Sequence, residues 1–569
     1  MCKNLLSYLL PILFSSFIWA AERPQQKDFS IDILSENLFN PMEMDIAPDG
    51  KVFIAELMGN VKVFDPVKQT TKTIAQLDVM VKDKKQKLWD KEFGLMGLAL
   101  APDFEKSKWV YLTYSKDSDD LYALYHYVSR FKFDGEKLDL SSEQTLIKIP
   151  ARRDTNRLHE AGSLDFDADG NLYISTGDNQ WRTHYLYAAR TSSNSAVLNG
   201  KVLRIHPEPD GSYSIPKGNL FKPGTPKTLP EIYVMGCRNP FRIHVDKKTG
   251  FLYWGENGPP PHFSGDMLVE KDKLPDGYDE FNQAKQPGYH GWPFFVGKNF
   301  PYPKFDTETG KTGEFYKANE PINDMPMNNG LEHLPSVTEP MMWYSHNPSP
   351  DFPSFGMGGA SAIAGPVYHT EKNMAEDSFP AYYDNCWFIS DYCRSWIKVV
   401  RMNEKGERVS IEPFLGEVMY SKPVNLKFNE KGHLYVLQYG KGGWNSRNGS
   451  LIRIRHDKKG QNSLVSSSGG DSALKGLNPS HPGTKLIIKN NCIACHRSRE
   501  KVVGPSYQEV ADRYVCDEDT VKTLTERILK GSAGNWGTTY AMPGHGYLTE
   551  KELTNILDSI FTLKGRKGK

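Results

Sequence analysis

Three side chains near the C-terminal end have the spacing of a site for a covalently held metal cofactor. Cys492 and Cys495 stand three positions apart, and His496 follows directly. Two thiols at this spacing can each add to a vinyl group of haem, and the adjacent imidazole then binds the iron. A redox dithiol and half of a zinc site are the alternatives, but a zinc site needs a second ligand pair, and Cys516 with His545 fits poorly. The motif therefore predicts a c-type haem.

The iron of such a haem needs a sixth ligand or an open face. Met542, which Pro543 follows, lies between the haem motif and the last apolar helical pattern of the chain. A thioether ligand raises the reduction potential of the iron, which suits electron transfer. We therefore expect His496 and Met542 to be the two axial ligands.

The segment around these ligands resembles a class I cytochrome c over residues 484–565. The matching features are Gly504 with Pro505 after the haem motif, and the run GSAGNWG at 531–537 ahead of Met542. The resemblance implies a small electron-transfer domain with one covalent haem.

Helical periodicity supports an all-α module over residues 484–569. Apolar residues recur at helical spacing after Thr549, which forms a capping box with Glu552. A second helical pattern covers 521–529 and stops at Gly531. These helices are expected to position the haem ligands.

The preceding part of the chain has the character of β structure. Aromatic residues make up 12% of the sequence, and Gly (48) and Pro (37) are frequent. One pattern recurs, in which a turn with Asp-Gly or a related pair separates two apolar alternating stretches, as in a hairpin. It occurs at 44–56, 98–115, 164–178, 242–258, 379–392 and 426–440. With the strand-like sequence that follows each pair, this predicts a mainly β fold, a six-bladed β-propeller over residues 30–456. An array of β-sandwiches is the alternative.

Two other segments have distinct compositions. Residues 300–359 are rich in Pro, Met and Asn, and we expect a long loop over one mouth of the propeller. Residues 457–483 are polar and begin with a Ser/Gly-rich run, which predicts a flexible linker to the helical module.

The N-terminal residues have the pattern of a secretory signal. One lysine, Lys3, precedes an apolar stretch at 5–19, and Ala20-Ala21 closes it. A membrane anchor is the alternative, but the stretch is short and Pro11 interrupts it. We expect a signal peptide at 1–21 and a secreted or periplasmic protein without a membrane span.

Charge and cysteine content narrow the classes of partner. Lys plus Arg number 70 and Asp plus Glu 69, without a basic run, so a nucleic acid is not an expected partner. Beyond the haem thiols and the signal, the cysteines are Cys237, Cys386, Cys393 and Cys516. A secreted compartment permits disulfides among them, but the pairing stays open.

Longer motifs lie at the ends of the predicted propeller strands. They are FGLMGLALAPDF at 93–104, LHEAGSLDFDADGNLYISTGDN at 158–179, MGCRNPFRIHVD at 235–246, ENGP at 256–259, YDEFNQAKQPGYHGWP at 278–293 and GGASAIAGPVY at 358–368. Together they resemble the glucose/sorbosone dehydrogenase family of soluble quinoprotein aldose dehydrogenases. The resemblance implies oxidation of a sugar hydroxyl with pyrroloquinoline quinone (PQQ) and calcium.

The resemblance also implies roles for single residues. His159 matches the histidine of the family motif His-x-x-Gly, the general base that removes the hydroxyl proton. Arg238 and Asn239 match the pair that contacts the quinone, where the arginine stabilises negative charge. The alternative for His159 is a packed histidine at a strand edge. The alternative for Arg238 and Asn239 is a surface ion-pair residue and a turn.

Calcium ligands follow from the same resemblance. Gly258 and Pro259 match residues whose backbone carbonyls bind calcium, a cation that prefers oxygen ligands; a simple turn is the alternative. Asp279 and Glu280 are candidates either for a second, structural calcium or for an exposed acidic pair.

The chain departs from the family pattern at several positions. Glu92 stands where a glutamine lies beside the cofactor, and Leu158 where an acidic residue often orients the base. Cys393 aligns near the lysine that holds the cofactor. Arg394 and Lys422 are the expected substitutes, because a quinone with several carboxylates needs cations.

These observations predict a dehydrogenase that passes electrons to its own haem and then to an external acceptor such as another cytochrome. A two-electron oxidation must be passed on one electron at a time, and a linker gives the tethered haem a high effective concentration. Exposed apolar groups at 300–359, among them Met325, Met327, Trp343 and Tyr344, are the expected docking surface. The alternatives are a calcium-dependent sugar lactonase, for which haem has no role, and a non-catalytic carbohydrate-binding propeller tethered to the cytochrome.

Overall fold

The computed structural model covers the propeller strands and the C-terminal helices. The described residues are 23–564 without 84–87, 90–92, 117–122, 153–158, 180–184, 262–270, 307, 373, 417, 419, 441–445, 458–473, 491, 493–495, 500–503, 532–535, 537–544 and 546–547. Glu92, Leu158, Cys495, Met542, the signal and most of the predicted linker lie outside them.

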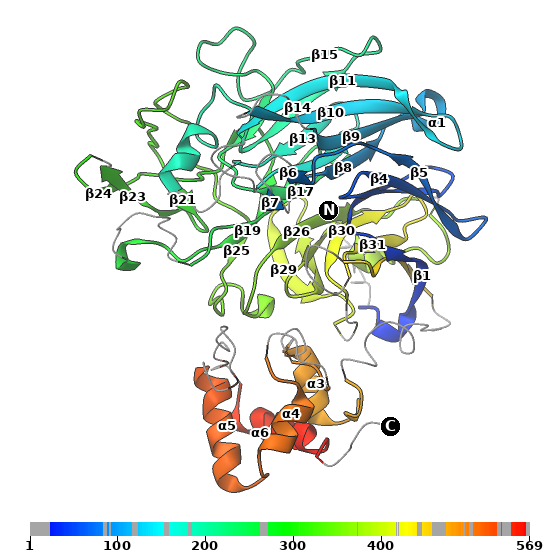
Figure 1. Cartoon of the computed structure of the whole chain (residues 1–569), viewed down its shortest axis with the longest axis vertical. Coiled ribbons are helices and arrows are strands. Elements are labelled where there is room, and N and C mark those ends of the chain that lie inside the picture. Colours follow the sequence, from blue (N-terminus) through cyan, green and yellow to red (C-terminus); the bar gives the residue numbers. More distant parts are fainter. Residues whose placement is uncertain are drawn as a thin grey trace, which may run out of the picture.

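Among the described residues, six larger sheets form most of the β part, beside three two-stranded sheets (Figure 1). The strands of the first three are β2 (Pro41–Ile46), β3 (Val52–Glu56), β4 (Asn60–Asp65) and β5 (Thr70–Gln76); β8 (Leu95–Leu100), β9 (Trp109–Lys116), β10 (Ala123–Phe133) and β11 (Leu138–Arg152); β12 (Ala161–Phe166), β13 (Leu172–Thr176), β14 (Lys201–Pro207) and β16 (Ile232–Met235). The strands of the other three are β17 (Pro240–Val245), β18 (Leu252–Glu256), β19 (Asp279–Ala284) and β25 (Met342–Tyr344); β26 (Ala362–Tyr368), β27 (Cys386–Asp391), β28 (Trp396–Met402) and β29 (Arg408–Pro413); β30 (Pro423–Phe428), β31 (Leu434–Gln438), β32 (Gly449–His456) and β1 (Phe29–Leu38). Within these sets all pairs are antiparallel, and β20 (Gly288–Tyr289) adds a parallel edge to the third.

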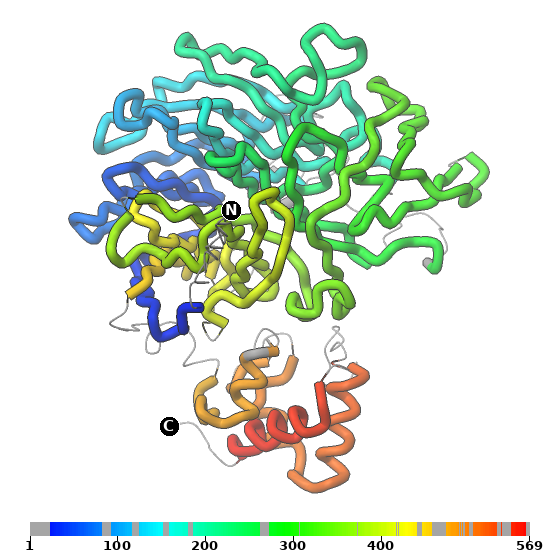
Figure 2. The backbone as a smooth tube through the Cα atoms, turned by 180° about the vertical axis from the view of Figure 1, so that it is seen from behind, coloured from blue at the N-terminus to red at the C-terminus, as the bar shows by residue number. Residues whose placement is uncertain are grey.

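The first strand of each sheet lies on the inside of a closed ring. β2 contacts β8, β8 contacts β12, and the series continues through β17, β26 and β30 back to β2. The last sheet is completed by the N-terminal strand β1, which pairs with β32 from Phe29 opposite His456. The fold is therefore the predicted six-bladed β-propeller (Figure 2).

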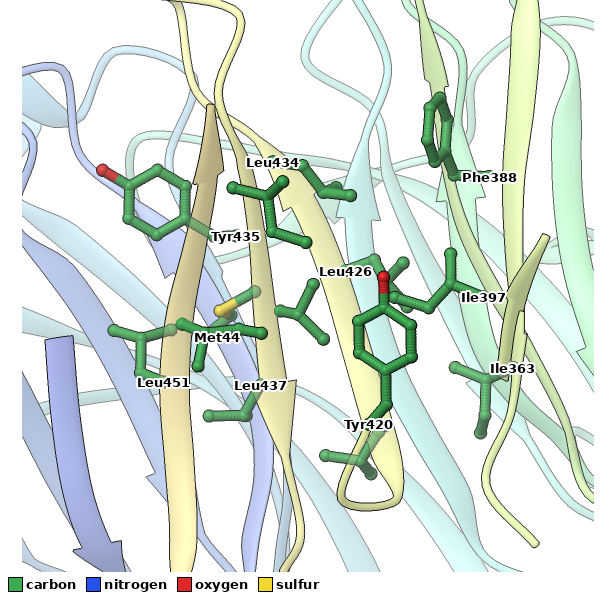
Figure 3. Packing of buried hydrophobic residues seen from close by; sticks show 14 of the residues in the cluster. Met44, Ile363, Phe388, Ile397, Tyr420, Leu426, Leu434, Tyr435, Leu437 and Leu451 are labelled. Atoms are coloured by element: carbon green, nitrogen blue, oxygen red, sulfur yellow. The ribbon is translucent and has the colours of Figure 1, made fainter. Parts of the chain in front are cut away.

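Apolar side chains fill the space between blades. β8 and β26 are buried along their whole length, as strands between two neighbouring sheets must be. In Figure 3, Met44 of β2 lies beside Leu437 and Leu451 of the last blade, while Phe388 and Ile397 come from the blade before it. This packing rigidifies the strand ends that carry the site.

A buried arginine and glutamate cross-link the inner strands. Arg242 donates from Nε to the Val424 carbonyl oxygen at 3.1 Å and also bonds the Met42 carbonyl, so it joins β17 to β30 and β2. Glu43 accepts from the backbone N–H groups of Leu98 at 2.9 Å and Leu164 at 3.4 Å. These side chains connect blades whose backbones do not form a common ladder.

Two sequence-based expectations were wrong in detail. The predicted hairpin at 379–392 contains the 3-10 helix η5 (Ala381–Tyr383) followed by one strand, β27, whose partner is β26. The segment 300–359 is not only a loop, because it contains β22 (Phe300–Pro301), β23 (Pro303–Asp306), β24 (Lys311–Phe315) and the blade strand β25.

The C-terminal helices agree with the predicted all-α module. They are α3 (Pro482–Lys489), α4 (Tyr507–Arg513), α5 (Glu518–Lys530) and α6 (Glu550–Phe561). Thr549 caps α6 in a capping box with Glu552, and Gly531 ends α5 at a φ of 81°. The other three helices pack against α6. Among the described residues, no helix has the length and hydropathy needed to cross a lipid bilayer.

Candidate functional site

One end of the propeller, called the mouth below, collects the predicted site residues. In each blade the inner strand begins, and the antiparallel second strand ends, at the same end of the ring. The residues in these positions include His159, Asp178, Arg238, Asn239, Asn257, Gly258, Cys393, Arg394 and Lys422. The fold thus brings residues that are far apart in sequence to one surface.

His159 is fixed by a carboxylate that sequence reasoning did not single out. Its Nδ1 lies 2.7 Å from Oδ1 of Asp178, and the imidazole is 7% exposed. The other oxygen of Asp178 accepts a hydrogen bond from Nε1 of Trp292 at 2.9 Å. A carboxylate on Nδ1 selects the tautomer whose Nε2 accepts a proton. Asp178 follows the end of β13 in the motif STGD, so the propeller topology was the signal that could have found it.

Arg238 is buried at the mouth, so the surface ion-pair alternative is wrong. Its side chain is 8% exposed, and Nη1 donates to the carbonyl oxygen of Asn257 at 2.7 Å. The guanidinium lies 5.7 Å from the ring centroid of Trp292. Asn239 accepts a hydrogen bond from the Ala161 N–H at 3.1 Å through Oδ1. The two residues therefore place a fixed cation beside the His159 segment.

The backbone at Gly258 lies against a buried carboxylate. Oδ1 of Asp279 accepts from the Gly258 N–H at 3.1 Å, and Oδ2 accepts from the Ala362 N–H at 2.9 Å. Burial raises the pKa of Asp279 to about 7, and the charge of Asp391 acts in the same direction. Asp279 and Glu280 are 5% and 7% exposed, so the alternative interpretation, that they form an exposed acidic pair, is wrong.

A second buried carboxylate, Glu256, closes the same region. Its Oε1 accepts from the backbone N–H of Arg238 at 2.9 Å and from that of Asn239. Burial, followed by the charge of Glu280, raises the pKa of Glu256 to about 8. Carboxyl groups of raised pKa beside backbone carbonyls favour a nearby cation. Among the described residues, no three His, Cys, Asp or Glu side chains gather as a metal site.

Arg394 and Lys422, the two predicted substitutes for cofactor-binding cations, differ in their surroundings. Arg394 donates to the backbone carbonyl oxygens of five residues: Ser345, Phe355, Gly356, Gly358 and Gly359. It thereby anchors the segment before β26. The contact predicted between Arg394 and the cofactor stays a prediction, which these hydrogen bonds disfavour.

Lys422 lies at the mouth, directly before β30. Its Nζ is 5.0 Å from the ring centroid of Tyr392. Burial lowers the pKa of Lys422, and the positive charge of Arg497 acts in the same direction. Arg497 directly follows His496 in the sequence, so a residue next to the predicted iron ligand lies within reach of this charge effect.

His496 is oriented for metal binding. Its Nδ1 donates to the carbonyl oxygen of Pro505 at 2.7 Å, and its backbone N–H donates to the Cys492 carbonyl at 2.9 Å. A hydrogen bond at Nδ1 directs Nε2 to the iron. Burial lowers the pKa of His496, which favours the neutral imidazole that binds metal. Cys492 and His496 are thus together, while Cys495 and Met542 stay predictions.

Gly504 makes room for the imidazole of His496, and we expect Gly504→Ala to weaken haem binding. A methyl group at this position would overlap the ring, with Nδ1 only 2.7 Å away. Such overpacking costs about 1–3 kcal/mol. The haem-to-protein absorbance ratio and thermal unfolding of the variant should both decrease. Gly313→Ala is the matched control, because its nearest atom would lie at 3.5 Å. An unchanged ratio and stability in Gly504→Ala would contradict this role.

Four of the described cysteines, Cys237, Cys386, Cys393 and Cys516, are free thiols. Cys237 and Cys386 are buried, Cys393 and Cys516 are exposed, and Cys492 is partly buried. Within the described part of the chain, the propeller therefore gains no stability from a disulfide.

Comparison with known proteins relates both parts of the chain to families. The profile of glucose/sorbosone dehydrogenase matches residues 38–322, and that of cytochrome c matches residues 480–564. Quinoprotein glucose dehydrogenase B of Acinetobacter calcoaceticus is 26% identical over 349 residues, which cover 57% of this chain and 65% of that protein. Cytochrome c-552 of Nitrosomonas europaea is 39% identical over 79 residues, 14% of this chain and 76% of that protein.

Solved structures share the propeller fold. The soluble aldose sugar dehydrogenase from Escherichia coli has a TM-score of 0.52 at 19% identity, covering 75% of this chain and 99% of that one. At this identity the likeness supports the architecture alone. The chain spans about two thirds of the length of the Acinetobacter protein that it matches.

Proposed function

Because the chain belongs to the glucose/sorbosone dehydrogenase family and carries a cytochrome c domain, which implies haem, we propose that it oxidises a sugar hydroxyl at the mouth and passes the electrons to its own haem. The observation that carries this proposal is the buried His159–Asp178 pair beside Arg238. A base held by a carboxylate next to a fixed cation suits removal of a hydroxyl proton. The N-terminal signal pattern supports export to the periplasm or beyond.

The residues at the mouth fit an anionic, planar quinone. Arg238 and Lys422 would supply cations for the carboxylates of PQQ, and Asn239 an amide. Trp292 and Tyr392 lie beside these two cations. When bound, PQQ would accept a hydride from the sugar carbon. Arg238 would then stabilise negative charge that develops nearby.

Calcium fits the backbone around Gly258 and Pro259. Carbonyl oxygens are hard ligands of the kind calcium prefers. Burial first, and neighbouring carboxylates second, raise the pKa of Asp279 and of Glu256, so added positive charge would favour their ionised forms. A divalent cation held by the two carbonyls would supply it, and it would polarise a bound carbonyl group as a Lewis acid.

The proton step is assigned to His159. Nδ1 is bonded to Asp178, so Nε2 would accept the hydroxyl proton as the carbon–hydrogen bond breaks. Asp178 would stabilise the resulting imidazolium, and Trp292 would keep that carboxylate in place. The proton later leaves to solvent, and the two electrons leave one at a time through the haem.

The position of Arg497 supports transfer between the domains. It lies close enough to Lys422 to influence its pKa, next in sequence to the iron ligand His496. The docking surface expected at 300–359 needs revision, because Trp343 and Tyr344 are 7% and 0% exposed. We propose instead that the segment containing His496 and Arg497 faces the mouth itself, with an external acceptor such as another cytochrome on its outer side.

Reduction of the haem by sugar should be intramolecular. We expect that the protein, matured with haem and loaded with PQQ and calcium, shows haem reduction on sugar addition at a rate independent of protein concentration. A tethered acceptor near the mouth needs no diffusional encounter. Stopped-flow absorbance over a range of protein concentrations measures this rate. The two domains expressed separately are the control and should give a bimolecular rate.

The same measurement tests the proposed function. Sugar-dependent haem reduction that rises with protein concentration would contradict transfer within one chain. No sugar-dependent reduction at all would favour the non-catalytic carbohydrate-binding propeller, for which the replacement of the family lysine by Cys393 is the supporting observation.

A further inference from the structure

The residue after His159 is a buried glutamate with its own set of partners. Glu160 is 5% exposed, and its Oε2 contacts Nε2 of His126, which is 6% exposed. The other oxygen, Oε1, accepts a hydrogen bond from Nδ2 of Asn179 at 3.0 Å. On the far side of His126, Nδ1 lies 3.0 Å from Oγ of Ser115, and Phe93 stacks on the ring at 5.8 Å. The glutamate therefore links its own blade to the blade of β9 and β10.

Two side-chain pairs thus lie next to each other along the segments 159–160 and 178–179. His159 pairs with Asp178, while the next residues, Glu160 and Asn179, pair with each other. Backbone hydrogen bonds join the segments as well, from Gly177 N–H to the Glu160 carbonyl and from Asn179 N–H to the His159 carbonyl, both at 3.4 Å. These backbone bonds are long, so side chains must contribute to the alignment.

The backbone at this point is strained. His159 has a φ of 63° and Ala161 a φ of 53°, both in the left-handed region, and Glu160 lies between them. For a residue with a Cβ atom, this conformation is unfavourable by about 1–2 kcal/mol. Such conformations persist when surrounding contacts over-determine them. The buried contacts of Glu160 lie between these two residues and can hold the backbone in this conformation.

We propose that the Glu160–His126 pair positions His159, by holding the strained segment so that its imidazole meets Asp178. Glu160 acts through the backbone, and its described contacts are to His126 and Asn179, so it is a positioning residue. The kinetic part of this inference rests on the proposed function, whereas the structural part does not.

The space beside the pair limits which substitutions can be tolerated. A cavity of about 10 Å³ lies between Thr113, Glu160 and Asn199, the size of one water molecule. Glu160→Gln keeps the shape of the side chain, accepts from Asn179 and donates to His126. Glu160→Ala removes both contacts and enlarges the cavity. The two variants therefore separate geometry from charge.

The test compares Glu160→Ala, Glu160→Gln and His126→Ala in the full chain, by crystallography of the protein without sugar and by kinetics after loading with haem, PQQ and calcium. In the two alanine variants we expect the His159 ring to leave Asp178, and kcat to fall roughly 10²-fold with KM nearly unchanged, as a misplacement of about 1 Å produces. Glu160→Gln should retain the pairing and most of the rate.

A matched control comes from the opposite end of the propeller. His433 is also buried, 5% exposed, and pairs with Asp377 at 2.8 Å in the turn before β31. His433→Ala should lower the thermal unfolding temperature to a similar extent as His126→Ala, without a change in kcat. This control separates positioning from general destabilisation.

The outcomes are distinct. If His159 stays on Asp178 in both alanine variants, the inference is overturned, whatever the activity. An equal loss of kcat in His433→Ala would also overturn it, because the effect would then be one of stability. If the wild type oxidises no sugar, the proposed function fails, while the crystal structures still decide whether Glu160 positions His159.

Discussion

Replacing His159 with alanine is expected to lower kcat/KM for sugar oxidation by roughly 10²- to 10⁴-fold, the loss typical of removing a general base. The imidazole is the basic group that Asp178 and Trp292 hold at the mouth. Without it, the hydroxyl proton has no fixed acceptor as the hydride leaves. Steady-state kinetics with a soluble dye as electron acceptor measures the effect without involving the haem.

Two further measurements make this result specific. PQQ affinity and the haem spectrum should be unchanged in His159→Ala, because neither depends on the imidazole. Asp178→Asn should also lose rate, since the amide stabilises an imidazolium poorly and can select the wrong tautomer. Full activity in His159→Ala would remove this residue from the mechanism.

Replacing Met542 with alanine is expected to abolish the methionine-to-iron charge-transfer band of the oxidised haem and to lower its reduction potential. Axial ligands tune haem potentials over a range of about 0.8 V, and a thioether favours the reduced iron. Absorption spectroscopy and a redox titration of the haem-loaded protein measure both changes. Haem attachment through Cys492 and Cys495 should persist.

The control for this substitution is an exposed methionine of the propeller. Met327 is 45% exposed, and Met327→Ala should leave the band and the potential as they are. A band that survives in Met542→Ala would show that another residue binds the iron. The propeller reaction with a soluble dye should be unaffected in either variant.

The blades could be predicted from sequence where their signals are local. Hairpins such as β12–β13 have an alternating pattern and a turn at Asp169-Gly170, which short-range physics determines. The strand β26 lacks such a pattern, because all of its residues are buried between two blades. Meanwhile Phe379 and Tyr383 are apolar for a different reason, since they join an aromatic cluster with Phe414. The misplaced hairpin follows from that ambiguity.

The site residues that lie within sequence motifs could be predicted. His159 and Arg238 are identified by the motifs around them, but Asp178 meets His159, Trp292 meets Arg238 and His126 meets Glu160 only in the folded propeller. The sequence also does not show whether a given arginine is available to bind a cofactor. The guanidinium of Arg394 donates hydrogen bonds to five backbone carbonyl oxygens, and the sequence alone does not distinguish it from an arginine that binds a cofactor.

The closure of the last blade by β1 has a consequence for biosynthesis. During synthesis from the N-terminus, β1 cannot pair with β32 until β32, which ends at His456, has been made. The ring can then close before the Cys492–His496 segment is complete, so the haem-bearing helices are added to a finished propeller. The same arrangement makes the two units separable for engineering. A cut after His456 removes the helices and leaves every ladder of the ring intact, whereas a deletion of β1 would expose a long sheet edge and invite aggregation.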